Sequence, residues 1–180
     1  LARDGRYVDL SSELFPGLTP ATRGIAVADV DGDGLPDMVY ANFWEDSLFI
    51  KNESPVGQFL GLHLLLPVAL PEAGLTPPTS PTMTRTRAGH PTWREGTPAI
   101  GAFVEIDGLA GGRQIRQVDG GNGHSGQRSP EIRFGLGSAK VDAVAVRITW
   151  RDAQGVLHKE ALTLAPGYHT VLLAASRKIR

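Results

Sequence analysis

The sequence contains no cysteine, which excludes disulfide bonds, thiolate metal sites and cysteine nucleophiles. Long apolar runs are also missing. The longest, residues 59–70, is interrupted by His63 and Pro67 and falls short of the roughly 18 to 20 residues that a membrane span needs. A net charge of −1 provides no basic surface for nucleic acid. We therefore expect no membrane span and no nucleic-acid partner.

Helical periodicity is almost absent, whereas 22 glycines and 13 prolines separate short apolar segments. Such segments, rich in β-branched and aromatic residues and bounded by turn residues, are typical of strands. The sequence therefore predicts a nearly all-β chain. The expected strands are residues 24–28, 38–42, 47–51, 59–66, 100–106, 113–118, 131–137, 141–150, 156–164 and 168–173.

The densest group of acidic side chains lies in residues 29–37, where aspartates occupy positions 1, 3, 5 and 9 of a glycine-containing loop. Carboxylates this close repel one another unless a cation lies among them, and calcium takes about six to eight oxygen ligands. The alternative is a solvated Asp/Gly turn without metal. The predicted calcium ligands are Asp29, Asp31, Asp33, Asp37 and the backbone carbonyl of Leu35.

The loop is not an EF-hand, because position 12 holds Tyr40 instead of glutamate and strand-like segments flank it. Residues 23–52, with this loop, Asn42 and the closing segment 48–52, resemble an FG-GAP (VCBS-type) repeat. The resemblance implies a blade of an integrin-like β-propeller that carries calcium in the loop. A propeller needs at least about four blades, so one repeat cannot close one by itself.

A second resemblance covers residues 100–173 and rests on Ile-Gly-Ala at 100–102, Gly-Gly-x-Gly at 120–123 and Phe-Gly-Leu-Gly at 134–137. Together these look like the ASPIC/UnbV domain, which follows FG-GAP repeats in secreted proteins similar to cartilage acidic protein. Residues 59–66 would form its first strand. The predicted fold is all-β, with one propeller-blade-like β unit that carries a calcium loop, plus a small antiparallel β-sandwich or barrel-like domain.

The expected boundaries follow from changes in composition along the chain. An N-terminal arm (1–22) precedes the repeat (23–56), and the second β domain (57–175) carries a Pro/Thr-rich insertion at 67–98 before a basic tail (176–180). The insertion has the composition of an extended or disordered surface loop. Because the sequence begins at Leu1 and not at Met, we expect a processed or partial chain.

Catalysis is not expected. Asp119, His124 and Ser125 are close in sequence, but neighbours on one loop rarely reach triad geometry, and the chain has no Gly-x-Ser-x-Gly elbow. A calcium ion saturated by loop ligands would leave no open position for activating water. The cation would serve to hold the fold.

The sequence therefore predicts a non-catalytic, calcium-stabilised, extracytoplasmic (periplasmic or secreted) interaction or structural module. Its expected partners are proteins: other subunits of a larger assembly, including one docked peripherally on a membrane complex, or missing propeller blades. Alternatives are a carbohydrate-binding module and a fragment of a longer secreted β-propeller protein. Candidate partner-binding residues are Phe43, Trp44 and Trp93, although Phe43 and Trp44 are also interpreted as simply covering their hairpin.

Overall fold

A computed structural model provides the structure of the chain. It describes residues 2–3, 6–17, 21–54, 57–67, 82–84, 96–108, 112–121, 129–138 and 140–173. The described part is almost entirely β, as predicted, and its one helix is the single turn α1 (Ser11–Leu14). Within these residues, no helix has the length and apolar character that crossing a membrane requires.

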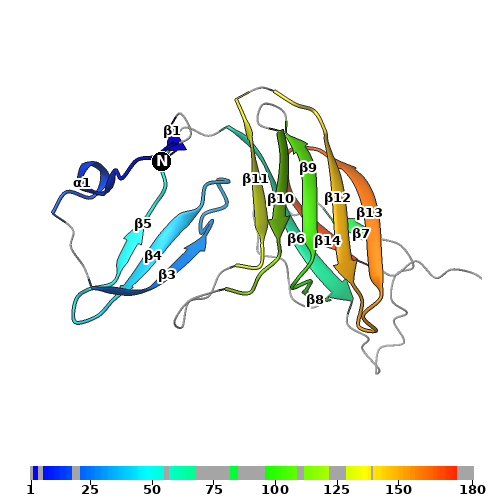
Figure 1. Cartoon of the computed structure of the whole chain (residues 1–180), viewed down its shortest axis with the longest axis horizontal. Coiled ribbons are helices and arrows are strands. Elements are labelled where there is room, and N and C mark those ends of the chain that lie inside the picture. The colour runs from blue at the N-terminus through cyan, green and yellow to red at the C-terminus, as the bar shows by residue number, and fades with distance from the viewer. Residues whose placement is uncertain are drawn as a thin grey trace, which may run out of the picture.

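The N-terminal part begins with a two-residue ladder between β1 (Ala2–Arg3) and β2 (Arg6–Tyr7). An antiparallel sheet of three strands follows, which we call the N-terminal sheet: β3 (Thr22–Ala28), β4 (Asp37–Asn42) and β5 (Leu48–Ile50). This is one strand fewer than the four of a typical propeller blade. The acidic segment connects β3 to β4 at one end of this sheet (Figure 1).

The C-terminal part is a sandwich of two sheets (Figure 1). The first sheet has the order β10-β9-β12-β13 and is antiparallel throughout. Burial alternates along β12, because successive side chains point to opposite faces of a strand. Its strands are β9 (Phe103–Gly108), β10 (Gly112–Gln117), β12 (Val144–Arg151) and β13 (Leu157–Leu164).

The second sheet has the order β11-β6-β14-β7, with β8 also paired to β6. Strands β6 and β14 are parallel, whereas the sequence predicted an antiparallel domain. They can be parallel because more than 90 residues, including most of the sandwich, separate them and supply the crossover. The strands are β6 (Gln58–Pro67), β7 (Thr82–Thr84), β8 (Gly96–Pro98), β11 (Ile132–Gly137) and β14 (Gly167–Leu172).

The two sheets enclose one hydrophobic core, to which the N-terminal sheet contributes no residue among those described. The described strands do not close into a barrel, so of the two predicted forms the sandwich is observed. The Pro/Thr-rich insertion contains β7 and β8, which pair with β14 and β6, and its residues 68–81 and 85–95 lie outside the described chain. The core residues with no exposed surface are Leu60, Leu62, Leu64, Val104, Ile106, Val118, Phe134, Ile148 and Val171.

Candidate metal loop and its contact with the sandwich

The predicted calcium loop, residues 29–37, is shaped by hydrogen bonds from its own backbone to Asp29; we call it the aspartate loop. Oδ1 of Asp29 accepts the N–H groups of Gly32 and Asp33 at 2.7 and 3.1 Å, and Oδ2 accepts that of Gly34 at 2.8 Å. Gly32 and Gly34 have φ values of 78° and 92°, a region that glycine adopts at little cost. The loop therefore curls around a buried carboxylate.

Asp37, at the start of β4, closes the other end of the loop. Its Oδ2 accepts the N–H of Val30 at 3.0 Å, and its Oδ1 accepts the N–H of Asn52 at 2.9 Å. The side chain of Asn52 donates to the carbonyl of Pro36 at 3.3 Å. These contacts fix the chain beyond β5 to the loop and keep Asp37 buried, with only 2% of its surface exposed.

Three of the four predicted aspartate ligands meet in space. Carboxylate oxygens of Asp29, Asp31 and Asp37 lie within 4.8 Å of one another, with Asp29 and Asp37 buried and Asp31 exposed. Asp33 is not part of this group; its Oδ1 accepts the N–H of Leu35 at 2.8 Å. The roles of Asp33 and of the Leu35 carbonyl stay predictions.

One protein cation lies on this cluster. The ammonium of Lys51 contacts Oδ2 of Asp31 at 2.8 Å. This hydrogen bond from Lys51 holds the pKa of the Asp31 carboxyl below its usual value, and Asp31 in turn raises the pKa of Lys51. Lys51 therefore keeps the Asp31 carboxyl ionised and offsets part of its negative charge.

The donor set fits calcium better than a softer ion. It consists of carboxylate oxygens only, without sulfur or imidazole, in a loop whose glycines allow it to adapt. Two of the three carboxylates are buried, and among the described residues their charge is stabilised by backbone N–H groups and, for Asp29, by two side chains of the sandwich. A divalent cation would complete that neutralisation.

The sandwich reaches the loop through Tyr168 of β14 and Arg133 of β11. The Tyr168 hydroxyl donates a hydrogen bond to Oδ2 of Asp29, and the Arg133 guanidinium lies 3.6 Å from the same oxygen and 3.0 Å from Glu131. Burial, and then the hydrogen bond to Asp29, raise the pKa of Tyr168, so its hydroxyl is a neutral donor at physiological pH. Sequence reasoning missed both residues, since no local motif marks them.

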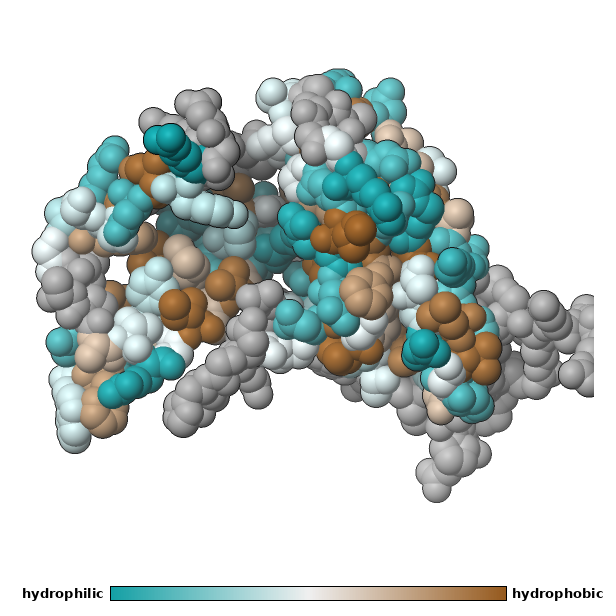
Figure 2. Space-filling model, viewed as in Figure 1, coloured by the Kyte–Doolittle hydropathy of each residue, from teal (hydrophilic) through white to brown (hydrophobic). Residues whose placement is uncertain are grey.

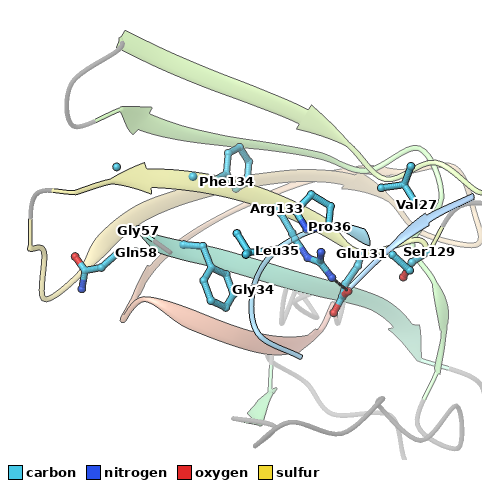
Figure 3. Close-up of a pocket in the computed structure, with 14 residues that line it drawn as sticks. Val27, Gly34, Leu35, Pro36, Gly57, Gln58, Ser129, Glu131, Arg133 and Phe134 are labelled. Carbon is cyan, nitrogen blue, oxygen red and sulfur yellow. Dashed lines mark hydrogen bonds and ion pairs between the residues drawn. The ribbon is translucent and has the colours of Figure 1, made fainter. Parts of the chain in front are cut away.

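A cavity of about 660 Å³ lies between the loop and the sandwich. Leu35 and Pro36 line it from the loop, Gln58 and Phe59 from β6, and Arg133 from β11 (Figure 3). Among the lining residues only Glu131 and Arg133 carry ionisable side chains, and they pair with each other (Figure 3).

The predicted partner-binding aromatics lie in the turn between β4 and β5, which is the end of the sheet away from the aspartate loop. Trp44 is 88% exposed and Phe43 is 44% exposed, so the interpretation that they simply cover the hairpin is wrong for Trp44. Trp44 has a φ of 68°, its ring lies 4.4 Å from that of Phe43, and Arg23 lies over Phe43. Trp93 lies outside the described residues.

The triad of the enzyme alternative cannot be placed, because His124 and Ser125 lie outside the described residues. The described histidines take structural contacts. His158 pairs with Asp152 at 2.7 Å and stacks on Trp150, while a ring nitrogen of His169 lies 2.7 Å from the carbonyl of Ala165. His63 is buried in β6.

Comparison with known proteins supports the second resemblance. Residues 92–180 match the family model described as ASPIC and UnbV. The chain is 31% identical over 151 residues to human cartilage acidic protein 1 and 30% identical over 151 residues to the mouse protein; each match covers 82% of this chain. The chain spans only 19% and 20% of the lengths of these relatives. The FG-GAP repeat stays a prediction.

Proposed function

We propose that this chain, whose C-terminal half matches the ASPIC and UnbV family, is a non-catalytic, calcium-stabilised module that acts outside the cytoplasm. The observation that carries the proposal is the convergence of Asp29, Asp31 and Asp37 at the junction of β3 and β4. Calcium would link the two ends of the loop and thereby stabilise the N-terminal sheet.

The residues that would hold calcium are Asp29, Asp31 and Asp37, with Asp33 and the Leu35 carbonyl as the further predicted ligands. The ion supplies positive charge to a group of carboxylates that otherwise repel one another. The N-terminal sheet depends on such help, because it contributes no buried hydrophobic residue to the described core. Its stability would come from the loop rather than from packing.

An extracytoplasmic location suits a weak site. External calcium is millimolar in many settings and fills sites with dissociation constants of about 10⁻⁴ to 10⁻³ M, whereas cytosolic calcium does not. The relatives are named for cartilage. The resemblance to secreted proteins agrees with this location.

A structural role fits the cavity better than catalysis does. Its two ionisable lining residues, Glu131 and Arg133, are engaged with each other. A general base or nucleophile needs a free polar group directed at a substrate. We therefore propose that the chain is not an enzyme.

The proposed partners are proteins, either other subunits, including those of a membrane-associated complex, or further propeller blades. Hydrophobic side chains remain at the surface of the N-terminal sheet (Figure 2). The strand register places them on both faces of the sheet. Phe49 and Val39 lie side by side on one face, and Ile25 lies on the other. The exposed Trp44 also suits stacking on a sugar ring, so carbohydrate binding is the second candidate.

Calcium titration of the full chain by calorimetry tests the proposal. We expect saturable binding that weakens at least about tenfold in Asp31→Asn, because one ligand charge is lost. Asp46→Asn is the matched control, since this exposed aspartate lies in the turn at the other end of the sheet. Equal binding by all three proteins, or no binding by the unmodified chain, would overturn the calcium assignment.

A further inference from the structure

Asp29 lies in the aspartate loop and also contacts the surface of the sandwich. Its Oδ1 accepts two N–H groups of the loop, whereas its Oδ2 accepts Gly34 N–H and the Tyr168 hydroxyl. Tyr168 lies 139 residues further along the chain. The Asp29 carboxylate therefore takes part both in the hydrogen bonds that shape the loop and in the contact of the loop with β14.

Two glycines create the space for this contact. A Cβ on Gly61, which lies directly opposite Tyr168 in the β6–β14 ladder, would come within 2.4 Å of the Tyr168 ring. A Cβ on Gly34 would come within 2.2 Å of the Phe59 ring, which itself packs edge-on against Tyr168 at 5.0 Å. The loop therefore packs so closely against the sandwich that one added methyl group at either glycine would clash with an aromatic ring.

We infer that Tyr168 is a positioning residue for the aspartate loop, and that cation occupancy of the loop is coupled to its docking on the sandwich. This inference rests on the proposed calcium function. The hydroxyl holds the Asp29 carboxylate in one orientation. A cation bound by Asp29, Asp31 and Asp37 would in turn hold Asp29 where Tyr168 can reach it, because coupling between two binding events is reciprocal.

Tyr168 is a better probe of this coupling than Arg133. Arg133 brings a positive charge to 3.6 Å from Asp29, so its removal would both lessen repulsion of a cation and loosen the docking contact. Tyr168 carries a phenol, which is uncharged at neutral pH. Replacing it by phenylalanine removes one hydrogen bond and retains the ring that packs against Phe59.

Calcium affinity of the full chain and melting temperature without calcium are the two measurements. Couplings between sites are typically about 5- to 150-fold, so we expect calcium binding about tenfold weaker in Tyr168→Phe. Tyr40→Phe is the matched control: its hydroxyl contacts only the Met38 sulfur among the described contacts, and it should bind within about twofold of the unmodified chain.

The outcomes separate the two proposals. A lower melting temperature in Tyr168→Phe with unchanged calcium affinity would show that Tyr168 only supports the fold, and would overturn the coupling alone. If the unmodified chain binds no calcium, the proposed function fails and the coupling fails with it. Should Tyr168→Phe not fold, Gly61→Ala displaces the hydroxyl without removing it, and the same loss of affinity is expected.

Discussion

At the scale of single residues, Asp29 and Asp31 meet positive charge in different ways. Asp29 is buried and is held by backbone N–H groups and by Tyr168, with Arg133 beyond hydrogen-bond distance. Asp31 is exposed and pairs with Lys51. In the proposed calcium site, Lys51 and Arg133 would therefore influence the affinity for the cation as well as the ligands do.

Lys51→Met should strengthen calcium binding several-fold, because the ammonium that competes for Asp31 is removed. In the calcium-free variant, the pKa of Asp31 should rise toward its ordinary value, because the hydrogen bond from Lys51 that lowers it is lost. In the unmodified chain the pKa of Asp31 is lower in the folded state than in the unfolded state. The ion pair with Lys51 therefore stabilises the fold at pH values above the unfolded-state pKa, and this stabilisation is lost as pH falls through the folded-state pKa. Calorimetry and carboxyl NMR titrations measure the two effects, and Lys140→Met is the control. Unchanged affinity would show that Lys51 does not compete.

Trp44→Gly should change the free energy of unfolding by less than about 1 kcal/mol. Relief of a left-handed backbone is worth roughly 1 kcal/mol and offsets the loss of the contact with Phe43. Trp150→Ala, at a buried position in β12, should cost about 3 to 5 kcal/mol in the same urea titration. A large loss in Trp44→Gly would mean that Trp44 packs against the protein and is not free for a partner.

At the scale of elements, the sequence locates ten of the described strands but not the short strands β1, β2, β7 and β8, nor the contacts among strands. The expected segments 38–42, 59–66, 131–137 and 156–164 match β4, β6, β11 and β13 to within two residues at each end. Local alternation and turn residues carry that information. The parallel pairing of β6 with β14 and the contact of Tyr168 with Asp29 join distant segments, so no local pattern reveals them.

The aspartate loop shows the same limit at shorter range. Spacing alone predicted Asp29, Asp31, Asp33 and Asp37 as equivalent ligands. The structure brings three of them together, while Asp33 accepts a hydrogen bond from the N–H of Leu35. Which carboxylates converge depends on local φ and ψ values that residue type does not determine.

Gly34→Ala should destabilise the chain more than Gly101→Ala does. Both glycines have φ near 90°, so both substitutions strain the backbone, at a cost of about 1 to 2 kcal/mol. A Cβ at Gly101 meets open space, whereas at Gly34 it meets the Phe59 ring. Overpacking of this kind adds roughly 1 to 3 kcal/mol, measured by urea unfolding. Equal costs would contradict close docking of the loop on β6.

At the scale of the whole molecule, stability is divided unequally. The described hydrophobic core belongs to the sandwich, and the N-terminal sheet is held by its ladders, by the aspartate loop and by the contacts of that loop with Tyr168 and Arg133. The match spans only about a fifth of the length of the curated relatives. Calcium would therefore matter most at the N-terminal end.

Thermal unfolding of the full chain, with calcium and with a chelator, tests the central claim most directly. At calcium about 100 times its dissociation constant, the native state gains about 2.7 kcal/mol, which raises the melting temperature by roughly 5 to 10 °C for a chain of this size. We predict that rise in the unmodified chain and its loss in Asp31→Asn. The same melting temperature with calcium and with chelator would contradict the account and leave the loop as an Asp/Gly turn without a metal.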